Sequence, residues 1–280
     1  MTQVSFKDKK PTLFVVSTPI GNLSDITYRA VETLKSVTCC YAEDTRTTSV
    51  LFRHYGIGTR LESYHAHSTA SRTEDVLDRL SKGEDVALVS DAGTPLVSDP
   101  GEGLVKAVIT SGYHVVAIPG ASATLAALVS SGQDAQPFVF LGFLPRKSKE
   151  MGDRLNAYRG RRETLVILEA PSRLSKTLPV LLDVLGDRTL SVCRELTKTF
   201  ETITRTTLGE AVGLEFPERG EYTLVIGGDT TATTYDHLSI NEHVRRYIDA
   251  GETEKDAMKK TASDRNISKS DVYKSYKIDT

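Results

Sequence analysis

At residues 86–101 the chain reads Val-Ala-Leu-Val-Ser-Asp-Ala-Gly-Thr-Pro-Leu-Val-Ser-Asp-Pro-Gly, and this stretch decides the predicted fold. Residues 86–90 are a short apolar run, typical of a strand that is buried on both faces. Residues 91–101 hold two glycines, two prolines and two aspartates, which is the composition of a loop. Apolar residues then recur at helical spacing over 104–109. A loop between such a strand and helix lies where open α/β sheets bind ligands, so we expect the floor of a small-molecule site.

Composition limits the class of protein. The chain has 280 residues, enough for two domains, and its formal net charge of −2 argues against a globally basic nucleic-acid coat but allows a local basic patch. Three cysteines cannot form a disulfide framework and are expected to be reduced and buried. The start of the chain is polar, and no segment is long enough to span a bilayer. We therefore expect a soluble, cytoplasmic protein with no membrane association.

Strands alternate with helices in the first half of the chain. Helical patterns separate five apolar runs and end at Gly56, Gly83 and Ser131. This alternation predicts an α/β fold with a parallel sheet, and we assign residues 11–133 to an N-terminal domain. The strands are expected at 12–17, 37–42, 60–65, 86–90 and 114–118.

The pattern changes at 132–137, where Gly-Gln-Asp-Ala-Gln-Pro marks the predicted domain boundary. Consecutive strands without an intervening helix then indicate a mixed α+β sheet in a C-terminal domain, residues 134–229. A threonine-rich linker leads to a small helical extension, 237–280, with about three short helices. Strands of the second sheet are expected at 138–144, 164–168, 189–193, 199–207 and 222–226.

Several familiar signatures are missing. The chain has neither the G-x-x-x-x-G-K-[ST] phosphate loop nor the G-x-G-x-x-G dinucleotide fingerprint. His65-Ala-His67 has no third ligand at a recognisable spacing, so we interpret it as a strand-end loop and predict no metal site. Four polar turns instead follow successive strands, at 18–21, 43–46, 91–101 and 119–122. Turns that meet at one edge of a parallel sheet predict a pocket there, although each turn alone is also explained as a connection or a helix cap.

These turns resemble one known family in sequence and in order. The chain is similar, over roughly residues 12–228, to the 16S ribosomal RNA cytidine 2′-O-methyltransferase branch of the tetrapyrrole methylase superfamily. The segments that carry the resemblance are Thr-Pro-Ile-Gly-Asn-Leu (18–23), Ala-Glu-Asp-Thr-Arg (42–46), the loop 90–101, Pro-Gly-Ala-Ser-Ala (119–123), Gly-Phe-Leu-Pro-Arg-Lys (142–147), Leu-Glu-Ala-Pro-Ser-Arg (168–173) and Arg-Glu-Leu-Thr-Lys (194–198).

The resemblance implies a two-domain tetrapyrrole-methylase-like fold, S-adenosylmethionine as methyl donor in the cleft between the domains, 16S ribosomal RNA or the small ribosomal subunit as substrate, and a homodimer. It also implies which residues contact the donor, mainly through backbone and small side chains. These donor-site residues are Pro19, Asp91, Gly93, Thr94, Pro95, Val97, Ser98, Ser122, Ala123, Leu144 and Ala170.

Methyl transfer to a ribose hydroxyl benefits from a base, because the hydroxyl is a poor nucleophile at neutral pH. Asp44 and Lys147 are the candidates, and Asp44 is equally explained as the cap of the following helix. Arg46 is a candidate for holding a phosphate. A local basic excess over 146–176 predicts further RNA contacts, for which we single out Arg146, Lys147, Arg161, Arg162 and Arg173.

Two other functions stay open. A methyltransferase of the same fold that acts on a tetrapyrrole or a protein side chain is the first, and the basic excess disfavours it when the acceptor is small. The second is a non-catalytic RNA-binding protein that keeps the fold. Calorimetry with the donor separates the second from an enzyme, and a labelled methyl group identifies the acceptor.

Overall fold

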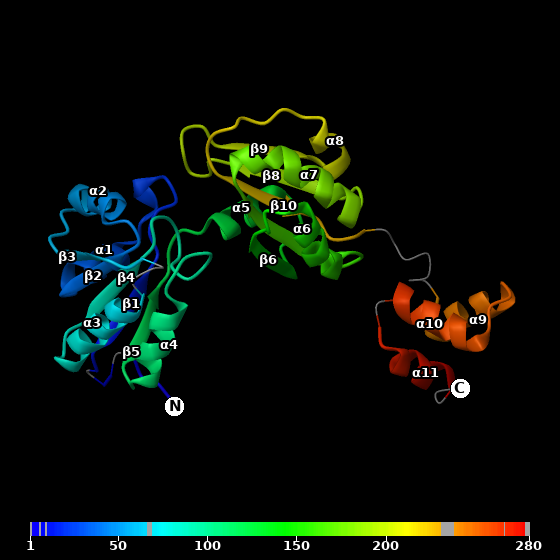
Figure 1. The fold of residues 1–280 in the computed structure, drawn as a ribbon, viewed down its shortest axis with the longest axis horizontal. Coiled ribbons are helices and arrows are strands. Elements are labelled where there is room, and N and C mark those ends of the chain that lie inside the picture. The colour runs from blue at the N-terminus through cyan, green and yellow to red at the C-terminus, as the bar shows by residue number, and fades with distance from the viewer. Residues whose placement is uncertain are drawn as a thin grey trace. The chain divides into compact units, whose positions relative to one another are not determined.

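The computed structural model describes residues 2–5, 7–8, 10–65, 69–230, 238–265 and 267–277. The chain forms two compact units, and Figure 1 shows their elements in chain order. The larger unit, residues 1–159 and 163–228, contains both β-sheets. The smaller unit, residues 160–162 and 229–280, contains the last helices.

The first sheet is parallel, with strand order β3-β2-β4-β1-β5, which confirms the predicted N-terminal architecture. Its central strands β1 and β4 are almost completely buried, as the continuous apolar runs in the sequence indicate. The strands are β1 (Thr12–Val16), β2 (Cys39–Ala42), β3 (Arg60–Ser63), β4 (Val86–Val89) and β5 (His114–Ile118).

Helices cover both faces of this sheet. Leu34 of α1 and Phe52 of α2 pack with Val16 on one face. Leu80 of α3 and Leu104 of α4 pack with the opposite face. Because every crossover returns the chain to the same edge, the loops that follow the strands gather at the carboxyl end of the sheet. The helices are α1 (Tyr28–Ser36), α2 (Thr45–Tyr55), α3 (Thr69–Ser81) and α4 (Glu102–Thr110).

The second sheet is mixed, as predicted, with strand order β6-β7-β10-β8-β9. Strands β6 and β7 pair in parallel, whereas the remaining neighbours are antiparallel. The register of β6 against β7 shifts between Phe140 and Gly142, a bulge that turns this end of β6. The strands are β6 (Phe138–Phe143), β7 (Thr164–Glu169), β8 (Thr189–Arg194), β9 (Thr202–Thr207) and β10 (Tyr222–Ile226).

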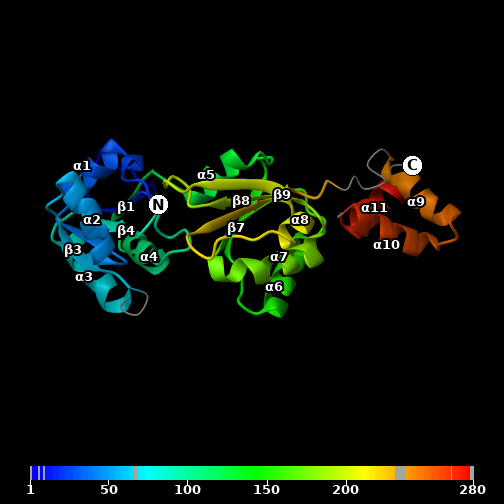
Figure 2. The same ribbon diagram turned by 90° about the horizontal axis from the view of Figure 1, so that it is seen from above.

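Helix α5 (Ala123–Ser131) packs on the second sheet rather than the first. Its Ala127 and Leu128 lie in one cluster with Val166, Cys193 and Val225. Figure 2 shows α5 on one side of this sheet and α6 and α7 on the other. The predicted boundary after residue 133 therefore separates α5 from the sheet that buries its apolar side chains. The helices on the other side are α6 (Ser148–Leu155), α7 (Pro171–Leu185) and α8 (Leu208–Val212), and two short 3-10 helices are η1 (Leu23–Asp25) and η2 (Asn156–Tyr158).

The smaller unit has a core of its own. Helix α9 (Ile240–Asp249) begins with a capping box of Ser239 and Glu242. It is followed by α10 (Glu254–Asp264) and α11 (Lys269–Lys277). Buried Val244, Ala257, Ala262 and Val272 form the cluster that holds these helices together. In the part of the chain that the structure describes, no helix is long and apolar enough to cross a membrane.

Candidate functional site

The turns after β1, β4 and β5 are joined directly by hydrogen bonds. The backbone N–H of Thr18 donates to the carbonyl of Gly93 (2.8 Å), and the N–H of Gly93 donates back to Thr18 (3.1 Å). The hydroxyls of Ser17 and Thr94 are 2.9 Å apart. The Thr94 hydroxyl also contacts the carbonyl of Ala121 at 3.4 Å. Three of the four polar turns thus form one structure at the edge of the sheet.

The fourth turn is attached through Asp91. The N–H of Asp44 donates to Asp91 Oδ1 at 2.9 Å, which links the start of α2 to the loop after β4. Asp91, one of the predicted donor-site residues, thus joins two of the turns. All four turns therefore converge.

The loop after β4 has an unusual backbone. Leu96 and Ser98 adopt φ values of 72° and 71°, a region that side chains with a Cβ rarely occupy. At Gly101 (φ 136°) a Cβ would lie 2.9 Å from Leu88 Cδ2, so the close approach of loop and strand requires glycine. Strain of this kind is retained where the surrounding structure enforces it, often at ligand sites.

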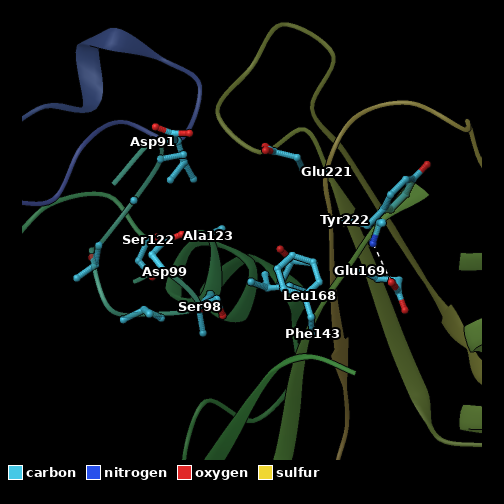
Figure 3. A pocket seen from close by; sticks show the side chains of 18 of the residues that line it. Asp91, Ser98, Asp99, Ser122, Ala123, Phe143, Leu168, Glu169, Glu221 and Tyr222 are labelled. Carbon is cyan, nitrogen blue, oxygen red and sulfur yellow. Dashed lines mark hydrogen bonds between the residues drawn. The ribbon is translucent and has the colours of Figure 1, made fainter. Parts of the chain in front are cut away.

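These loops form one wall of a pocket, which we call the donor pocket, with a cavity volume of about 480 Å³. The second sheet supplies the other wall, so the pocket lies between the two sheets of the larger unit. Figure 3 shows Asp91, Asp99, Ser122 and Ala123 on one side and Phe143, Leu168, Glu221 and Tyr222 on the other. The predicted donor-site residues that line it are Asp91, Gly93, Thr94, Val97, Ser98, Ser122, Ala123 and Ala170.

Three predicted donor-site residues lie outside that lining. Pro19 lines a neighbouring hollow, Leu144 lines a third one, and Pro95 is buried within its loop. On the second wall, Ala170 was predicted and the other members were not. Phe143 and Leu168 stand in segments that carry the family resemblance, but they were not singled out. The unpredicted members Phe140, Phe143, Leu168, Glu221 and Tyr222 stand at or near strand ends, and this position does not identify them as pocket residues until the two sheets are brought together.

Carboxylates dominate the charge of the donor pocket. Among the residues that the structure describes, five acidic side chains and no lysine or arginine line it. Such a pocket attracts a cation, and apolar side chains nearby can contact an aromatic or aliphatic part of the same ligand. The carboxylates are those of Glu43, Asp91, Asp99, Glu169 and Glu221.

Two of these carboxylates hold their protons more tightly than usual. Burial and, next, the nearby charge of Glu43 raise the pKa of Asp99 to about 6. Burial, followed by the charge of Asp91, also raises the pKa of Glu43. A cationic ligand would stabilise the ionised forms. Both residues stand in the segments singled out from the sequence, but neither was predicted as a site residue.

Glu169 has a different environment, because its carboxylate is fully occupied by the protein. It accepts hydrogen bonds from the Thr177 hydroxyl (2.5 Å) and the N–H of Ala170 (2.8 Å), and Arg173 Nε lies 3.2 Å away. The side chain is almost completely buried. Glu169 therefore fixes the turn from β7 into α7, which carries Ala170 at the pocket.

The two candidate bases have partners of their own. Asp44 caps α2 by accepting from the N–H of Arg46 (2.8 Å), and the Arg46 guanidinium binds the same carboxylate at 2.6 Å. These hydrogen bonds lower the pKa of Asp44 to about 2, which makes it a weak base. Lys147 Nζ lies 2.8 Å from Glu150 on the exposed first turn of α6. Neither candidate lines the donor pocket in the described structure.

Basic residues line a hollow beside the donor pocket, with a volume of about 750 Å³. We call it the basic hollow; it shares Phe143 and Ala170 with the donor pocket. Arg173 donates to the carbonyls of Leu144 (3.0 Å) and Pro145 (3.1 Å) and therefore supports the backbone here. The basic side chains that line this hollow are Arg146, Arg154 and Arg173.

Arg146 differs from its neighbours because it makes no hydrogen bond or ion pair with the described residues. Its exposed guanidinium is available for an anion. Arg161 and Arg162 belong to the smaller unit. His67, the second histidine considered as a metal ligand, lies outside the described residues, and no cluster of three metal-ligating side chains occurs among those that are described.

Fold and pocket together define a class of protein: a two-sheet α/β protein whose converging loops enclose a pocket for a cationic small molecule. Comparison with known proteins makes the class specific. Residues 12–212 match the family model described as Tetrapyrrole (Corrin/Porphyrin) Methylases. The chain belongs to this family, and it is an S-adenosylmethionine-dependent methyltransferase.

Similar curated proteins extend over nearly the whole chain. "Ribosomal RNA small subunit methyltransferase I" of Bacillus subtilis (strain 168) is 46% identical over 286 residues, which cover 99% of this chain and 98% of that protein. The protein of the same name from Halalkalibacterium halodurans is 43% identical and covers 98% of each chain.

Solved structures support the fold. The methyltransferase CobJ has a TM-score of 0.61 at 20% identity, covering 79% of this chain and 95% of that one. Diphthine synthase has a TM-score of 0.60 at 13% identity, covering 78% of this chain and 90% of that one.

The residues present fit the methyl donor chemically. S-adenosylmethionine carries a sulfonium and an ammonium group, for which the acidic lining of the donor pocket provides counter-charges. The adenosine part requires apolar walls and backbone polar groups, which Val97, Leu168 and the glycine-containing loop offer. Gly93 leaves its backbone open at φ 84°, where a larger residue would be strained.

Proposed function

We propose that this methyltransferase modifies the 2′-hydroxyl of a cytidine ribose in 16S ribosomal RNA, free or within the small ribosomal subunit. Two features of the larger unit support this proposal together. The donor pocket is acidic and suits a cationic methyl donor, and the basic hollow that shares its wall presents Arg146 to an anionic acceptor. The names of the relatives that are 43–46% identical point to the same class of substrate.

The donor supplies a methyl group that is activated by its bond to a sulfonium sulfur. The sulfur is a good leaving group. The protein's task is therefore mainly to align the acceptor oxygen with that methyl group in a site from which water is excluded. The two sheets provide opposite walls, and the hydrogen-bonded turns of the first sheet keep their wall rigid. We assign the donor to Asp91, Gly93, Thr94, Val97, Ser98, Ser122, Ala123 and Ala170, together with Glu43 and Asp99.

Acceptor RNA is proposed to contact the exposed cations of residues 146 and 147. Arg146 has no partner among the described residues, and the pair of Lys147 with Glu150 is exposed, so an RNA phosphate can replace Glu150 at little cost. Arg173 contributes by supporting the backbone that carries Arg146. Arg161 and Arg162 stay predicted RNA contacts of the smaller unit.

We also propose a homodimer in the cytoplasm. Leu125 and Val129 stand four residues apart on one face of α5 and are 52% and 76% exposed. Apolar side chains at this spacing form a stripe that a second copy can cover. Light scattering on the wild-type chain and on Val129→Glu measures the oligomeric state directly. A monomeric wild type would contradict the proposed dimer. If Val129→Glu is still a dimer, the interface lies elsewhere.

A methyl-transfer assay tests the proposed function. Purified protein is incubated with S-adenosylmethionine that carries a labelled methyl group and with ribosomal RNA or small subunits from cells that lack the protein. The label is expected on one cytidine 2′-oxygen of 16S RNA, and the same modification should be missing from those cells and present in the wild type. Label on a protein or a tetrapyrrole instead would overturn the assignment of the acceptor. Donor binding without any transfer would favour the non-catalytic alternative.

A further inference from the structure

A second hollow, with a volume of about 460 Å³, adjoins the donor pocket. The two share Ile20, Asp91, Ala92 and Glu221, so a group in either one reaches the same wall. Apolar side chains and hydroxyl groups both line the second hollow, as suits the mixed surface of a nucleotide. The residues lining only this hollow are Thr18, Pro19, Gly21, Leu23, Thr47, Thr48, Val50, Leu51, Ser90 and Lys198.

Lys198 belongs to the segment Arg194–Lys198, which stood out in the sequence but does not line the donor pocket. The segment is strained, because Glu195 and Thr197 adopt φ values of 52° and 69°. Its conformation aims Lys198 across to the loop after β1. There a Cβ on Gly21 would lie 2.3 Å from Lys198 Cε, so the stem of the lysine occupies the space that any side chain at position 21 would need.

Two carboxylates fix the head of this lysine. Lys198 Nζ lies 2.9 Å from Glu195 Oε1 and 2.8 Å from Glu221 Oε2. The N–H of Glu195 donates to the carbonyl of Glu221 (3.1 Å), and the N–H of Glu221 donates to Glu195 Oε1 (3.0 Å), so the cation is held by a structure that spans two loops. Burial opposes the charged form of Lys198, but its hydrogen bonds to Glu221 and Glu195 outweigh burial and raise its pKa.

Lys198 is also the one basic side chain that lines either hollow in the part of the chain that the structure describes. Lys198 is already paired with Glu195 and with Glu221, whose side chain is 73% exposed. A phosphate in the second hollow can take the place of this exposed carboxylate as the partner of Lys198, because an exposed ion pair contributes little to stability.

We propose that the second hollow receives the nucleotide that is methylated and that Lys198 holds a phosphate next to its ribose. This acceptor subsite rests on the proposed function, because it presupposes an RNA acceptor. The four shared residues place the ribose hydroxyl at the boundary with the donor pocket, where the methyl group can reach it. Lys198 is a positioning residue in this arrangement, since it stays protonated and takes no proton from the hydroxyl.

Two variants test the subsite in the full-length chain. Val50→Trp fills the hollow from an exposed position on α2, where the valine is 56% exposed and its replacement need not disturb the core. Lys198→Gln removes the cation and keeps the length of the side chain. The matched controls are Val212→Trp, at a valine that is 43% exposed on α8, and Lys106→Gln, at a lysine paired with Glu102 at 2.5 Å, because neither residue lines the hollow.

Calorimetry with S-adenosylmethionine and methyl transfer to 16S ribosomal RNA give the readouts. We expect both variants to bind the donor as the wild type does. Val50→Trp should lose methyl transfer, and Lys198→Gln should raise KM for the RNA about tenfold, with a smaller effect on kcat, because a charged hydrogen bond is lost. The slope of log KM against log salt should also fall by about 0.7 for the lost phosphate contact. Both controls should behave as the wild type.

The outcomes separate the subsite from the function on which it rests. If the wild type methylates the RNA and both variants do so with unchanged KM and salt dependence, the acceptor subsite is wrong and the function stands. Weakened donor binding in either variant would assign the hollow to the donor instead. If the wild type transfers no methyl group to ribosomal RNA, the proposed function fails and the subsite fails with it.

Discussion

Asp99 is the residue at which protonation and donor binding are most closely coupled. Its carboxyl lines the donor pocket, and burial, reinforced by Glu43, raises its pKa to about 6. Below that pH the carboxyl is mostly neutral and no longer attracts a cation. The ionised form, which would balance the charge of a cationic donor, predominates only above about pH 6.

We expect the affinity for S-adenosylmethionine to fall as the pH is lowered from 7.5 to 5. In Asp99→Asn this dependence should be flatter and the affinity at pH 7.5 lower, because the counter-charge is missing at every pH. Calorimetry across this range measures both proteins. Parallel pH profiles for the two proteins would exclude Asp99 as the titrating group.

Lowering the pH should raise the stability of the donor-free protein, whereas it should lower the affinity for the donor. The pKa of Asp99 is about 6 in the folded chain against an ordinary value of 3.8, so the folded state binds more protons than the unfolded state between these values. The free energy of unfolding then decreases as the pH rises through this window. Asp99→Asn removes this contribution, so at pH 7.5 it should be at least as stable as the wild type in urea unfolding. Lower stability of the variant would show that the carboxylate makes a structural contact.

Asp44 allows a test that separates a helix cap from a general base. Asparagine caps helices as well as aspartate does, but it cannot accept a proton. If Asp44 acts through the cap and through Arg46, Asp44→Asn should keep most of the methyl transfer, whereas Asp44→Ala should lower the melting temperature by a few degrees. Initial rates and thermal melts of both variants check this. Loss of activity in Asp44→Asn with an unchanged melting temperature would restore the catalytic role.

At the scale of elements, arginines position the end of β6, where its register shifts, and the segment that leads from it to α6. Arg154 donates to the carbonyls of Leu141 (2.6 Å) and Phe143 (3.2 Å), and Arg173 donates to Leu144 and Pro145 while it contacts buried Glu169. A segment without regular hydrogen bonds needs such side-chain donors for its carbonyl groups. Arg154 and Arg173 therefore support the backbone that surrounds the basic hollow, whereas Arg146 lines the same hollow, is exposed and makes no such contact with the described residues.

Arg173→Ala and Arg146→Ala should consequently have contrasting effects. Arg173→Ala leaves Glu169 and two carbonyls with fewer partners and should lower the free energy of unfolding by about 2–3 kcal/mol, the usual size for hydrogen bonds of a charged group. Arg146→Ala should leave stability unchanged and weaken RNA binding most at low salt. Urea unfolding and filter binding at several salt concentrations measure the two effects. Equal RNA affinity of Arg146→Ala and the wild type at every salt concentration would remove Arg146 from the RNA site.

Elements with strong local signals were predictable from the sequence. The strands at 114–118 and 222–226 have the predicted bounds because apolar runs there are flanked by turn residues. The convergence of four turns followed from the parallel sheet. The partner of α5 was not predictable, because a helix of small apolar residues fits either sheet. The ion pair between Lys198 and Glu221 was not predictable either. The two residues are 23 positions apart, and the strands next to them had no assigned neighbours before the sheet order was known.

For the whole molecule, the larger unit contains everything that lines the donor pocket, from Ile20 to Thr223. That range spans two sheets, which is why no single motif in the sequence describes the site. The smaller unit has its own buried cluster around Val244 and contributes no described residue to the pocket. Donor binding and the helical extension are therefore expected to be separable.

A chain that ends at Thr230 tests this separation. It keeps the hydrogen bond between the N–H of Asp229 and the carbonyl of Arg161 (2.8 Å) and lacks α9, α10 and α11. We expect it to melt cooperatively and to bind S-adenosylmethionine with the affinity of the full-length protein. Val244→Asp in the full-length chain is the matched variant, because a charge in the buried cluster should unfold the extension without removing it. If either protein loses donor affinity while its larger unit still melts cooperatively, the extension takes part in the donor site, and the independence of the two units would have to be abandoned.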